Sequence, residues 1–187
     1  MAGHSVCPWW IGWFLASPLR RLMQDPVPIL EPHVSAGMTV LEPGPGMGFF
    51  TLELARLVGP SGRVIAVDVQ PEMIAGLQRR AARAGLDDRI DARVVSPTSM
   101  DLHDLTRAVD FVLAFAVVHE MPSVGSFFSQ VAATLKPEGT LLLAEPAGHV
   151  DDANWAEELA AAAQAGLTVA DHPAIRSSRA EVLRKTG

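Results

Sequence analysis

The chain has 187 residues, 49% of them hydrophobic and 19% charged, which provides for one domain with a full apolar core. Its formal net charge of -6 gives no basic surface for nucleic acid, so a DNA or RNA substrate is disfavoured. Cys7 is the single cysteine and excludes an internal disulfide, so nothing points to an oxidising compartment.

Three of the four tryptophans lie in the apolar run Trp9–Ala16. This run is far shorter than the about 20 residues of a membrane-spanning helix. Arg20 and Arg21 follow it, whereas the basic residues of a signal peptide come first. We therefore predict no membrane span and a cytoplasmic protein.

Residues 1–35 are predicted to form an N-terminal helical cap. Pro18 begins a second helix there, because proline fits the first turn of a helix and breaks its interior. The prolines Pro26, Pro28 and Pro32 predict an extended or turning connection. The remaining residues, 36–187, are predicted to form a single globular domain.

A glycine-rich loop follows the first predicted strand. The apolar run ends in Glu42, and Gly44, Gly46 and Gly48 follow at alternate positions before residues with helical apolar spacing. Glycine permits a positive φ and lets a ligand approach the backbone, while a helix start adds N–H groups and the positive end of a dipole. The loop therefore predicts a binding site for a small molecule.

The glycine spacing argues against a dinucleotide. A dinucleotide fingerprint has its third glycine three residues after the second, and Phe49 occupies that position. The carboxylate of Glu42 would also repel a pyrophosphate, whereas it suits a ligand with an amino group. A nicotinamide dehydrogenase is therefore disfavoured.

Strands and helices alternate along the rest of the chain. Strands are predicted at 38–42, 63–68, 90–95, 109–115, 140–144, 167–170 and 175–183, and helices at 50–58, 71–84, 101–107, 124–135 and 151–165. The run 63–68 is apolar without alternation, as in buried parallel strands. This order predicts βαβ units and a doubly wound α/β sheet.

An acid followed by G-x-G-x-G resembles motif I of the class I S-adenosylmethionine-dependent methyltransferases. The segment Leu135–Pro146 is similar to the helix, turn and strand that precede the fifth strand of that family. Matched regions in the correct order extend from Met38 to Pro146. The resemblance implies a seven-stranded sheet of order 3-2-1-4-5-7-6 with strand 7 antiparallel, and S-adenosylmethionine as the cofactor.

Asp68, at the end of the second predicted strand, can accept hydrogen bonds from both hydroxyls of a ribose. The resemblance places Val69, Gln70 and Met73 beside the adenosine. The family often has an acid after the third strand, and Ser96 or a backbone group stands in its place here. The predicted cofactor residues are Glu42, Gly44, Pro45, Gly46, Gly48, Asp68, Val69, Gln70, Met73, Ser96 and Phe115.

The acceptor side is predicted at the ends of the fourth and fifth strands, because ligands of open α/β sheets bind at the carboxyl ends of the strands. His119 and Glu120 follow the fourth strand, and Glu145 and His149 follow the fifth. His119 is the first candidate base, since imidazole titrates near neutral pH. A structural hydrogen-bonding role of His119 is the alternative. The catalytic set predicted from the sequence is His119, Glu120 and His149.

The residues after the fourth predicted strand also bear on the acceptor. The stretch Phe115–Pro122 lacks the Asn/Asp-Pro-Pro-aromatic signature of methyltransferases that act on exocyclic base amines. This departure further disfavours a nucleic-acid amine as the acceptor.

The N-terminal segment leaves several uses open. If it folds over the site, His4 and Cys7 could meet His119 or His149 and form a soft nitrogen and sulfur site for a metal, a metalloid or a thiol-bearing acceptor. The tryptophans could instead form an apolar wall that selects a small or flat acceptor. They could also dock on a partner or a membrane surface, or exchange between subunits of a homo-oligomer.

These observations predict an S-adenosylmethionine-dependent methyltransferase that acts on a small-molecule acceptor. A protein, peptide or RNA methyltransferase is an alternative within the same fold. A non-catalytic module that binds S-adenosylmethionine is an alternative from another class.

Overall fold

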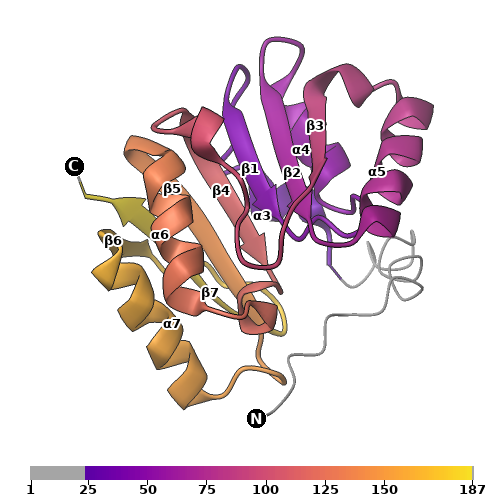
Figure 1. Cartoon of the computed structure of the whole chain (residues 1–187). Coiled ribbons are helices and arrows are strands. Elements are labelled where there is room, and N and C mark those ends of the chain that lie inside the picture. The colour runs from indigo at the N-terminus through magenta and orange to yellow at the C-terminus, as the bar shows by residue number, and fades with distance from the viewer. Residues whose placement is uncertain (1–23, 187) are drawn as a thin grey trace. The chain divides into compact units, whose positions relative to one another are not determined.

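The computed structural model describes residues 24–186, and Figure 1 shows the arrangement of their elements. Predictions for the first helices, His4, Cys7 and the three N-terminal tryptophans lie outside these residues. The helices are α3 (Pro26–Leu30), α4 (Thr51–Val58), α5 (Pro71–Ala84), α6 (Val124–Thr134) and α7 (Asp152–Gln164), with short 3₁₀ turns η1 (Asp87–Arg89), η2 (His103–Leu105) and η3 (Val118–Glu120).

Seven strands form one sheet in the order β3-β2-β1-β4-β5-β7-β6. The strands are β1 (Thr39–Pro43), β2 (Arg63–Asp68), β3 (Ile90–Val94), β4 (Val109–Phe115), β5 (Leu135–Pro146), β6 (Leu167–Asp171) and β7 (Ser178–Lys185). β7 pairs antiparallel with both β5 and β6, whereas β1, β2 and β3 pair in parallel. The predicted fold class, strand order and antiparallel seventh strand are confirmed.

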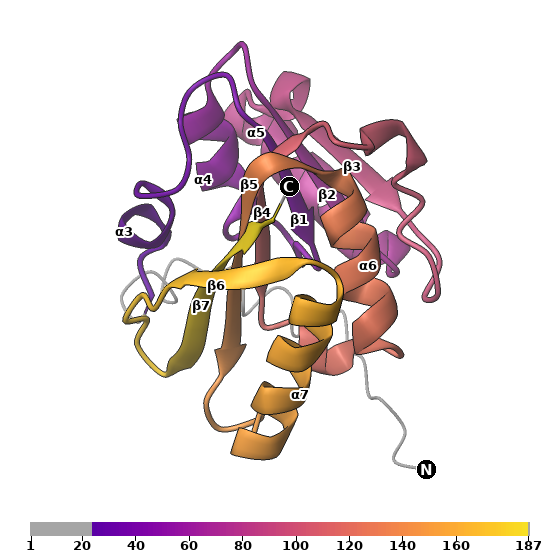
Figure 2. The same ribbon diagram turned by 90° about the vertical axis from the view of Figure 1, so that its left-hand side faces the viewer.

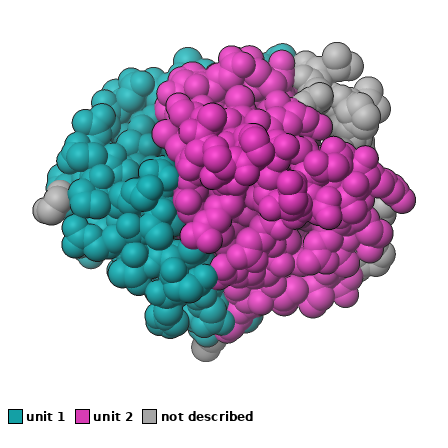
Figure 3. Space-filling model, turned by 90° about the horizontal axis from the view of Figure 1, so that it is seen from above, with its two compact units in different colours: residues 1–5, 97–187 teal, residues 6–96 magenta. Residues whose placement is uncertain are grey.

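The described residues fall into two compact units, 24–96 and 97–186, which Figure 3 distinguishes by colour. In the unit 24–96, α4 packs against β1 and β2, and α5 packs against β2 and β3. The core of this unit is apolar and fully buried, and Leu41, Ile65 and Leu77 have no exposed surface. Burial on this scale explains why β2 is apolar at four successive positions.

The unit 97–186 is built on β4, β5, β7 and β6. α6 and α7 pack on each other beside these strands, as Figures 1 and 2 show. Phe111 and Phe128 are the largest side chains without exposed surface in this unit. β5 is central because it pairs with β4 on one edge and with β7 on the other.

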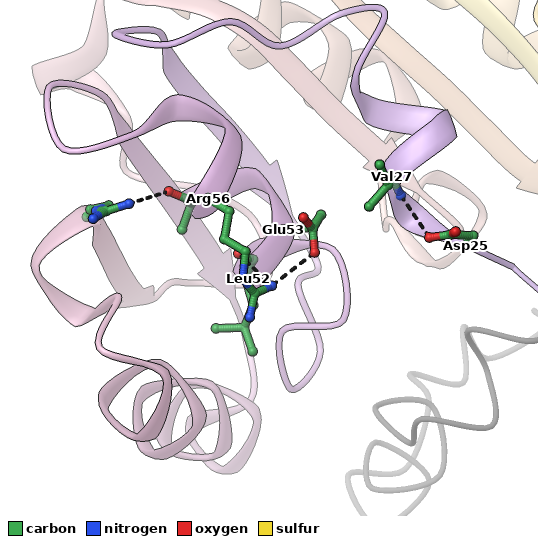
Figure 4. A network of polar contacts seen from close by, with 7 residues as sticks. Asp25, Val27, Leu52, Glu53 and Arg56 are labelled. Carbon is green, nitrogen blue, oxygen red and sulfur yellow. Dashed lines mark hydrogen bonds and ion pairs between the residues drawn. The ribbon is translucent and has the colours of Figure 1, made fainter.

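The connection predicted at Pro26–Pro32 is wrong in part, because Pro26–Leu30 is the helix α3. Proline fits the first turn of a helix, where its missing N–H has no partner to lose. Asp25 caps this helix, and its Oδ1 accepts a hydrogen bond from Val27 N at 3.1 Å (Figure 4). Leu30 is fully buried, so the segment belongs to the packed part of its unit.

α4 is the helix that follows the glycine loop, and it begins at Thr51. Figure 4 shows Arg56 in its last turn, where the guanidinium donates to Glu53 Oε2 at 2.9 Å and to Leu52 O at 3.4 Å. A basic residue in the last turn of a helix also interacts favourably with the helix dipole.

Two predicted boundaries in the unit 97–186 are also wrong. β5 begins at Leu135 and not at residue 140, because Leu135 is buried and pairs with Val109 of β4. The helix predicted at 101–107 is only the turn η2, since Asp101 and Arg107 have positive φ angles of 48° and 53°. Such backbone geometry cannot continue a right-handed helix.

The buried aromatic ring of Phe128 provides a test of the unit 97–186. Phe128→Ala should lower the free energy of unfolding by about 3–5 kcal/mol, because the change leaves a cavity in a closely packed core. Urea denaturation measures the effect. The neighbouring Ser129 is exposed, and Ser129→Ala should have a much smaller effect. A loss below about 1 kcal/mol in Phe128→Ala would contradict the packing described above.

Candidate functional site

The glycine loop leaves the end of β1 and turns back toward α4. Gly44, Gly46 and Gly48 have positive φ angles of 67°, 54° and 85°. L-amino acids with a side chain rarely adopt such angles, so all three glycines are needed for this path. The loop is closed by hydrogen bonds from Gly44 N to Val67 O at 2.9 Å and from Gly48 N to Pro45 O at 3.0 Å.

One side of this loop is packed and the other is open. A Cβ at Gly48 would lie 2.5 Å from Leu77 Cδ1 of α5, whereas a Cβ at Gly46 would have no atom of residues 24–186 within 4 Å. A bare backbone with open space beside it allows a ligand to lie against the main chain. The loop residues therefore fit a small-molecule cofactor.

The acids predicted for the cofactor lie at the ends of β1 and β2. Glu42 is buried with 3% exposure, and Asp68 is half-buried. Asp68 Oδ1 accepts a hydrogen bond from Gln70 N at 2.9 Å, which fixes the orientation of the carboxylate. A fixed carboxylate after the second strand has the chemistry that a ribose diol needs.

The other predicted cofactor residues differ in exposure. Met73 is buried in α5 with 3% exposure, while Val69 and Gln70 are half-buried. Ser96 is exposed, and Phe115 is half-buried at the end of β4. Their contacts with a cofactor stay predictions.

Sequence reasoning missed Thr51, the first residue of α4. Thr51 has no exposed surface, and its hydroxyl has no hydrogen-bond partner among residues 24–186. A buried hydroxyl without a partner is unusual, and its position next to the glycine loop marks a polar place that a ligand can satisfy. The signal in the sequence was a threonine in the first helical turn after the third glycine.

His119 and Glu145 form the polar centre of the unit 97–186. Glu145 has no exposed surface at the end of β5, and its Oε2 pairs with His119 Nδ1. Its Oε1 accepts hydrogen bonds from Val117 N at 3.1 Å and Val118 N at 2.7 Å. Three donors thus converge on one buried carboxylate and fix its position.

The pKa of His119 is raised above its ordinary value. The hydrogen bond from the imidazole to Glu145 is the main cause, and the nearby charges of Glu145, Glu120 and Glu158 add to it, while burial opposes them. His119 Nε2 lies 4.0 Å from Glu120 Oε1, which is too far for a hydrogen bond. The structure thus brings Glu120 near Nε2 of His119, while Nδ1 is paired with Glu145.

His149 follows β5 and is exposed, and its ring centroid lies 6.1 Å from that of His119. The four residues predicted on the acceptor side are therefore neighbours within one unit. Their roles in a reaction stay predictions. In the part of the chain that the structure describes, no group of three His, Cys, Asp or Glu side chains could hold a metal ion.

Glu158 of α7 joins this cluster and was also missed. It is buried with 3% exposure, and its Oε2 has no hydrogen-bond partner in the described chain. The pKa of Glu158 is raised to about 8, mainly by burial and also by the charges of Glu145 and Glu157, against a lowering effect of His119. At neutral pH Glu158 is therefore mostly a neutral acid. The sequence signal was an acid between Trp155 and Ala162, three and four residues away on the same side of α7.

A cavity of about 410 Å³ lies in the same unit. Met121, Pro122 and Ser123 line it before α6, and Glu157 and Ala161 line it from α7. Met121 is only two residues after His119. This volume is in the range of small-molecule sites, which are commonly about 300–1,000 Å³.

The parallel strands, the glycine loop after β1 and the acid at the end of β2 define a nucleoside-binding α/β fold of the methyltransferase type. A family model described as a methyltransferase domain matches residues 34–183. The chain therefore belongs to this family, which is that of the class I S-adenosylmethionine-dependent methyltransferases. S-adenosylmethionine is the cofactor that this family implies.

Among solved structures, a SAM-dependent methyltransferase from Aquifex aeolicus is similar, with a TM-score of 0.84 and 24% identity. The match covers 96% of this chain and 98% of that one. A putative S-adenosyl-L-methionine-dependent methyltransferase from Methanococcus maripaludis has a TM-score of 0.77 and 15% identity, with 96% and 90% covered. These likenesses show the fold.

Among curated proteins, the arsenite methyltransferase of Halobacterium salinarum is 30% identical over 60% of this chain and 28% of its own length. The ubiquinone biosynthesis O-methyltransferase of Bradyrhizobium diazoefficiens is 29% identical over 75% of this chain and 51% of its own length. The matches thus span about half or less of these two relatives. Among the described residues, no helix is long and apolar enough to cross a membrane.

The state of Glu158 predicts how stability depends on pH. Its pKa in the folded protein is about 8 and lies above the ordinary value of 4.5, so the folded state binds more protons between these values. The free energy of unfolding should therefore fall as the pH rises from 5 to 8. Glu158→Gln removes this titration, and it should make the protein more stable than the wild type at pH 8 by roughly 1–3 kcal/mol.

Urea denaturation at pH 5, 6.5 and 8 measures this difference. Glu157→Gln is the matched control, because Glu157 is the exposed neighbour on the same helix and its charge is the smallest of the causes that act on the pKa of Glu158, so the pH dependence should change only slightly. His119 also has a raised pKa, so its contribution is present below 6.5 and lost as the pH rises through the folded value. That loss should remain in Glu158→Gln. Parallel curves for the wild type and Glu158→Gln would contradict an ionisable Glu158 in this cluster.

Proposed function

We propose that this chain transfers a methyl group from S-adenosylmethionine to a hydroxyl group of a small molecule, with His119 as the base. The pair of His119 with the buried Glu145 is the observation that carries this proposal. Family membership supports the reaction class. The named relatives support a small acceptor, and the net charge of -6 disfavours a nucleic acid.

The unit 24–96 would hold the cofactor. The open side of the loop at Gly46 accommodates it against the backbone, Asp68 accepts hydrogen bonds from the ribose hydroxyls, and Glu42 suits its amino group. Thr51 offers a buried hydroxyl as a further hydrogen-bond partner. When bound, the cofactor supplies a methyl group that is already activated on a sulfonium, so the protein mainly has to position and deprotonate the acceptor.

The unit 97–186 would supply the base. Glu145 holds the proton of His119 on Nδ1, so a neutral imidazole has its lone pair on Nε2. Nε2 would take the proton of the acceptor hydroxyl as the bond between oxygen and the methyl carbon forms and the bond between that carbon and the sulfonium sulfur breaks, which leaves S-adenosylhomocysteine and an imidazolium. Glu145 then stabilises the imidazolium, because a buried carboxylate beside it raises the proton affinity of the ring.

A hydroxyl acceptor suits these residues better than arsenite does. Soft metalloids prefer thiolate ligands, and the chain has one cysteine. An imidazole and carboxylate pair is instead suited to removing a proton from a hydroxyl group. The cavity beside Met121 and Glu157 has room for a small molecule.

The base is tested by His119→Asn. We expect the rate of methyl transfer to a catechol, a small dihydroxy aromatic acceptor, to fall by about 10²–10⁴-fold, because a positioned base contributes that much. His103→Asn is the matched control, since His103 is exposed and lies elsewhere in the unit. Methylation is followed as transfer of labelled methyl from S-adenosylmethionine, and affinity for the cofactor is measured by calorimetry.

The same assay gives a pH profile. Because the pKa of His119 is raised, the rate should increase with pH through a value above 6.5. Glu145→Gln should shift this step toward lower pH, since it removes the main cause of the raised pKa. Cofactor binding without methylation of any acceptor would leave a non-catalytic binding module, and equal rates in the wild type and His119→Asn would refute His119 as the base.

A further inference from the structure

The glycine loop rests on one face of α5. Gly76, Leu77 and Arg80 are spaced so that they lie on the same side of this helix. Leu77 closes on Gly48, where an added Cβ would lie 2.5 Å from its Cδ1. Gly76 leaves room for Met47, since a Cβ at Gly76 would lie 3.0 Å from Met47 Cγ and 3.2 Å from its Sδ.

The third contact is polar. The guanidinium of Arg80 donates through Nη1 to the backbone carbonyl of Met47, in the middle of the loop. Arg80 is half-buried, and burial lowers its pKa below the ordinary value because it removes water from the charge. A charged donor that has lost water forms a stronger hydrogen bond to a carbonyl than an exposed one does.

The peptide unit between Met47 and Gly48 is therefore held at both of its polar atoms. Its carbonyl oxygen accepts from Arg80, and its N–H, which belongs to Gly48, donates to Pro45 O at 3.0 Å. Leu77 and Gly76 hold the same two residues by packing. Among residues 24–186, no atom lies within 4 Å of a Cβ placed at the neighbouring Gly46, so the fixed side of the loop is the side away from the proposed ligand.

We propose that Arg80 is a positioning residue for S-adenosylmethionine: it holds the Met47 carbonyl and thereby fixes the glycine loop in its binding shape without touching the cofactor. This rests on the cofactor site of the proposed function. A loop that is fixed before binding loses less conformational entropy when the ligand binds, so its affinity is higher. Arg80 should thus contribute to affinity for the cofactor and not to the transfer step.

The test replaces the guanidinium and keeps the apolar stem. Arg80→Met should weaken the binding of S-adenosylhomocysteine, the demethylated cofactor, by about tenfold in calorimetry, as expected when a hydrogen bond from a charged group is lost. Arg79→Met is the matched control, because Arg79 is exposed on the same helix and carries the same charge. The affinity of Arg79→Met for S-adenosylhomocysteine should stay within about twofold of the wild-type affinity, because we expect the effect to depend on the hydrogen bond to Met47 and not on the net charge. Arg80→Lys keeps a cationic donor and should recover part of the affinity.

Hydrogen exchange provides a readout without any ligand. In unliganded Arg80→Met, the Gly48 amide should exchange faster, while the amides of Val64 and Ile65 in β2 should exchange as in the wild type. In turnover, the KM for S-adenosylmethionine should rise with kcat unchanged. Affinity and Gly48 exchange equal to those of Arg79→Met would overturn the proposal, and so would a uniform loss of protection across β2, which indicates a merely structural role.

Gly76→Ala is a second variant in case Arg80→Met fails to fold. The added methyl group would lie close against the Met47 side chain. Alanine has a higher helix propensity than glycine, so weaker binding cannot be ascribed to unfolding of α5. Faster Gly48 exchange with unchanged affinity in this variant would also overturn the proposal, because affinity would then not depend on a fixed loop. A wild type that binds S-adenosylhomocysteine and methylates nothing would refute the proposed function alone, because affinity and exchange still report on Arg80.

Discussion

The buried carboxylate of Glu145 is the interaction on which the polar centre of the unit 97–186 depends. A carboxylate without contact to water is stable as an ion only when donors surround it. Val117 and Val118 supply two backbone N–H groups, and His119 supplies its Nδ1. The same three contacts fix the turn η3 and the orientation of the imidazole. The geometry of His119 is therefore a consequence of the charge requirement of Glu145.

The unit 24–96 forms its candidate site mainly through backbone geometry and packing. Its loop has no charged side chain at Gly44–Gly48, and its shape follows from three positive φ angles and from packing on α5. Backbone that is fixed on one side and bare on the other can bind a ligand through main-chain groups. Arg80 adds a charged contact on the packed side only. The half-buried guanidinium of Arg80 therefore stabilises the loop from its packed side, without placing a positive charge beside the ligand.

Much of this arrangement could be predicted from the sequence. The apolar runs of β2 and β4 have the predicted bounds, and Gly85 ends α5 in a left-handed conformation with φ 64°, as glycine at a helix end predicts. Local signals failed where pairing decided the structure. Leu135 continues the apolar stripe of α6, yet it belongs to β5 because it pairs with Val109. The pattern of side chains cannot show such a contact between distant segments.

The residues of the candidate sites also fall into two groups, those that local sequence features predict and those that only the folded structure reveals. Gly44, Gly46, Gly48 and Asp68 were identifiable, because a glycine loop and an acid at a strand end are local features. Thr51 and Glu158 were not, since a polar atom without a partner among residues 24–186 becomes visible only when the packing around it is known. Arg80 looks like any surface arginine in the sequence, and only the fold places it beside Met47.

The two acids of the His119 cluster differ in their hydrogen-bond partners. Glu145 accepts three hydrogen bonds, whereas Glu158 has an oxygen without a partner in the described chain and, with its raised pKa of about 8, keeps its proton at neutral pH. With His119 neutral, the cluster carries one buried negative charge. A proton taken from an acceptor hydroxyl would convert it into an ion pair without net charge, which a buried environment favours. If Glu158 were also ionised, its charge would raise the pKa of His119 further, in addition to the larger effect of the hydrogen bond to Glu145. The neutral state of Glu158 therefore limits how far the pKa of His119 is raised, and so favours the free lone pair that a base needs.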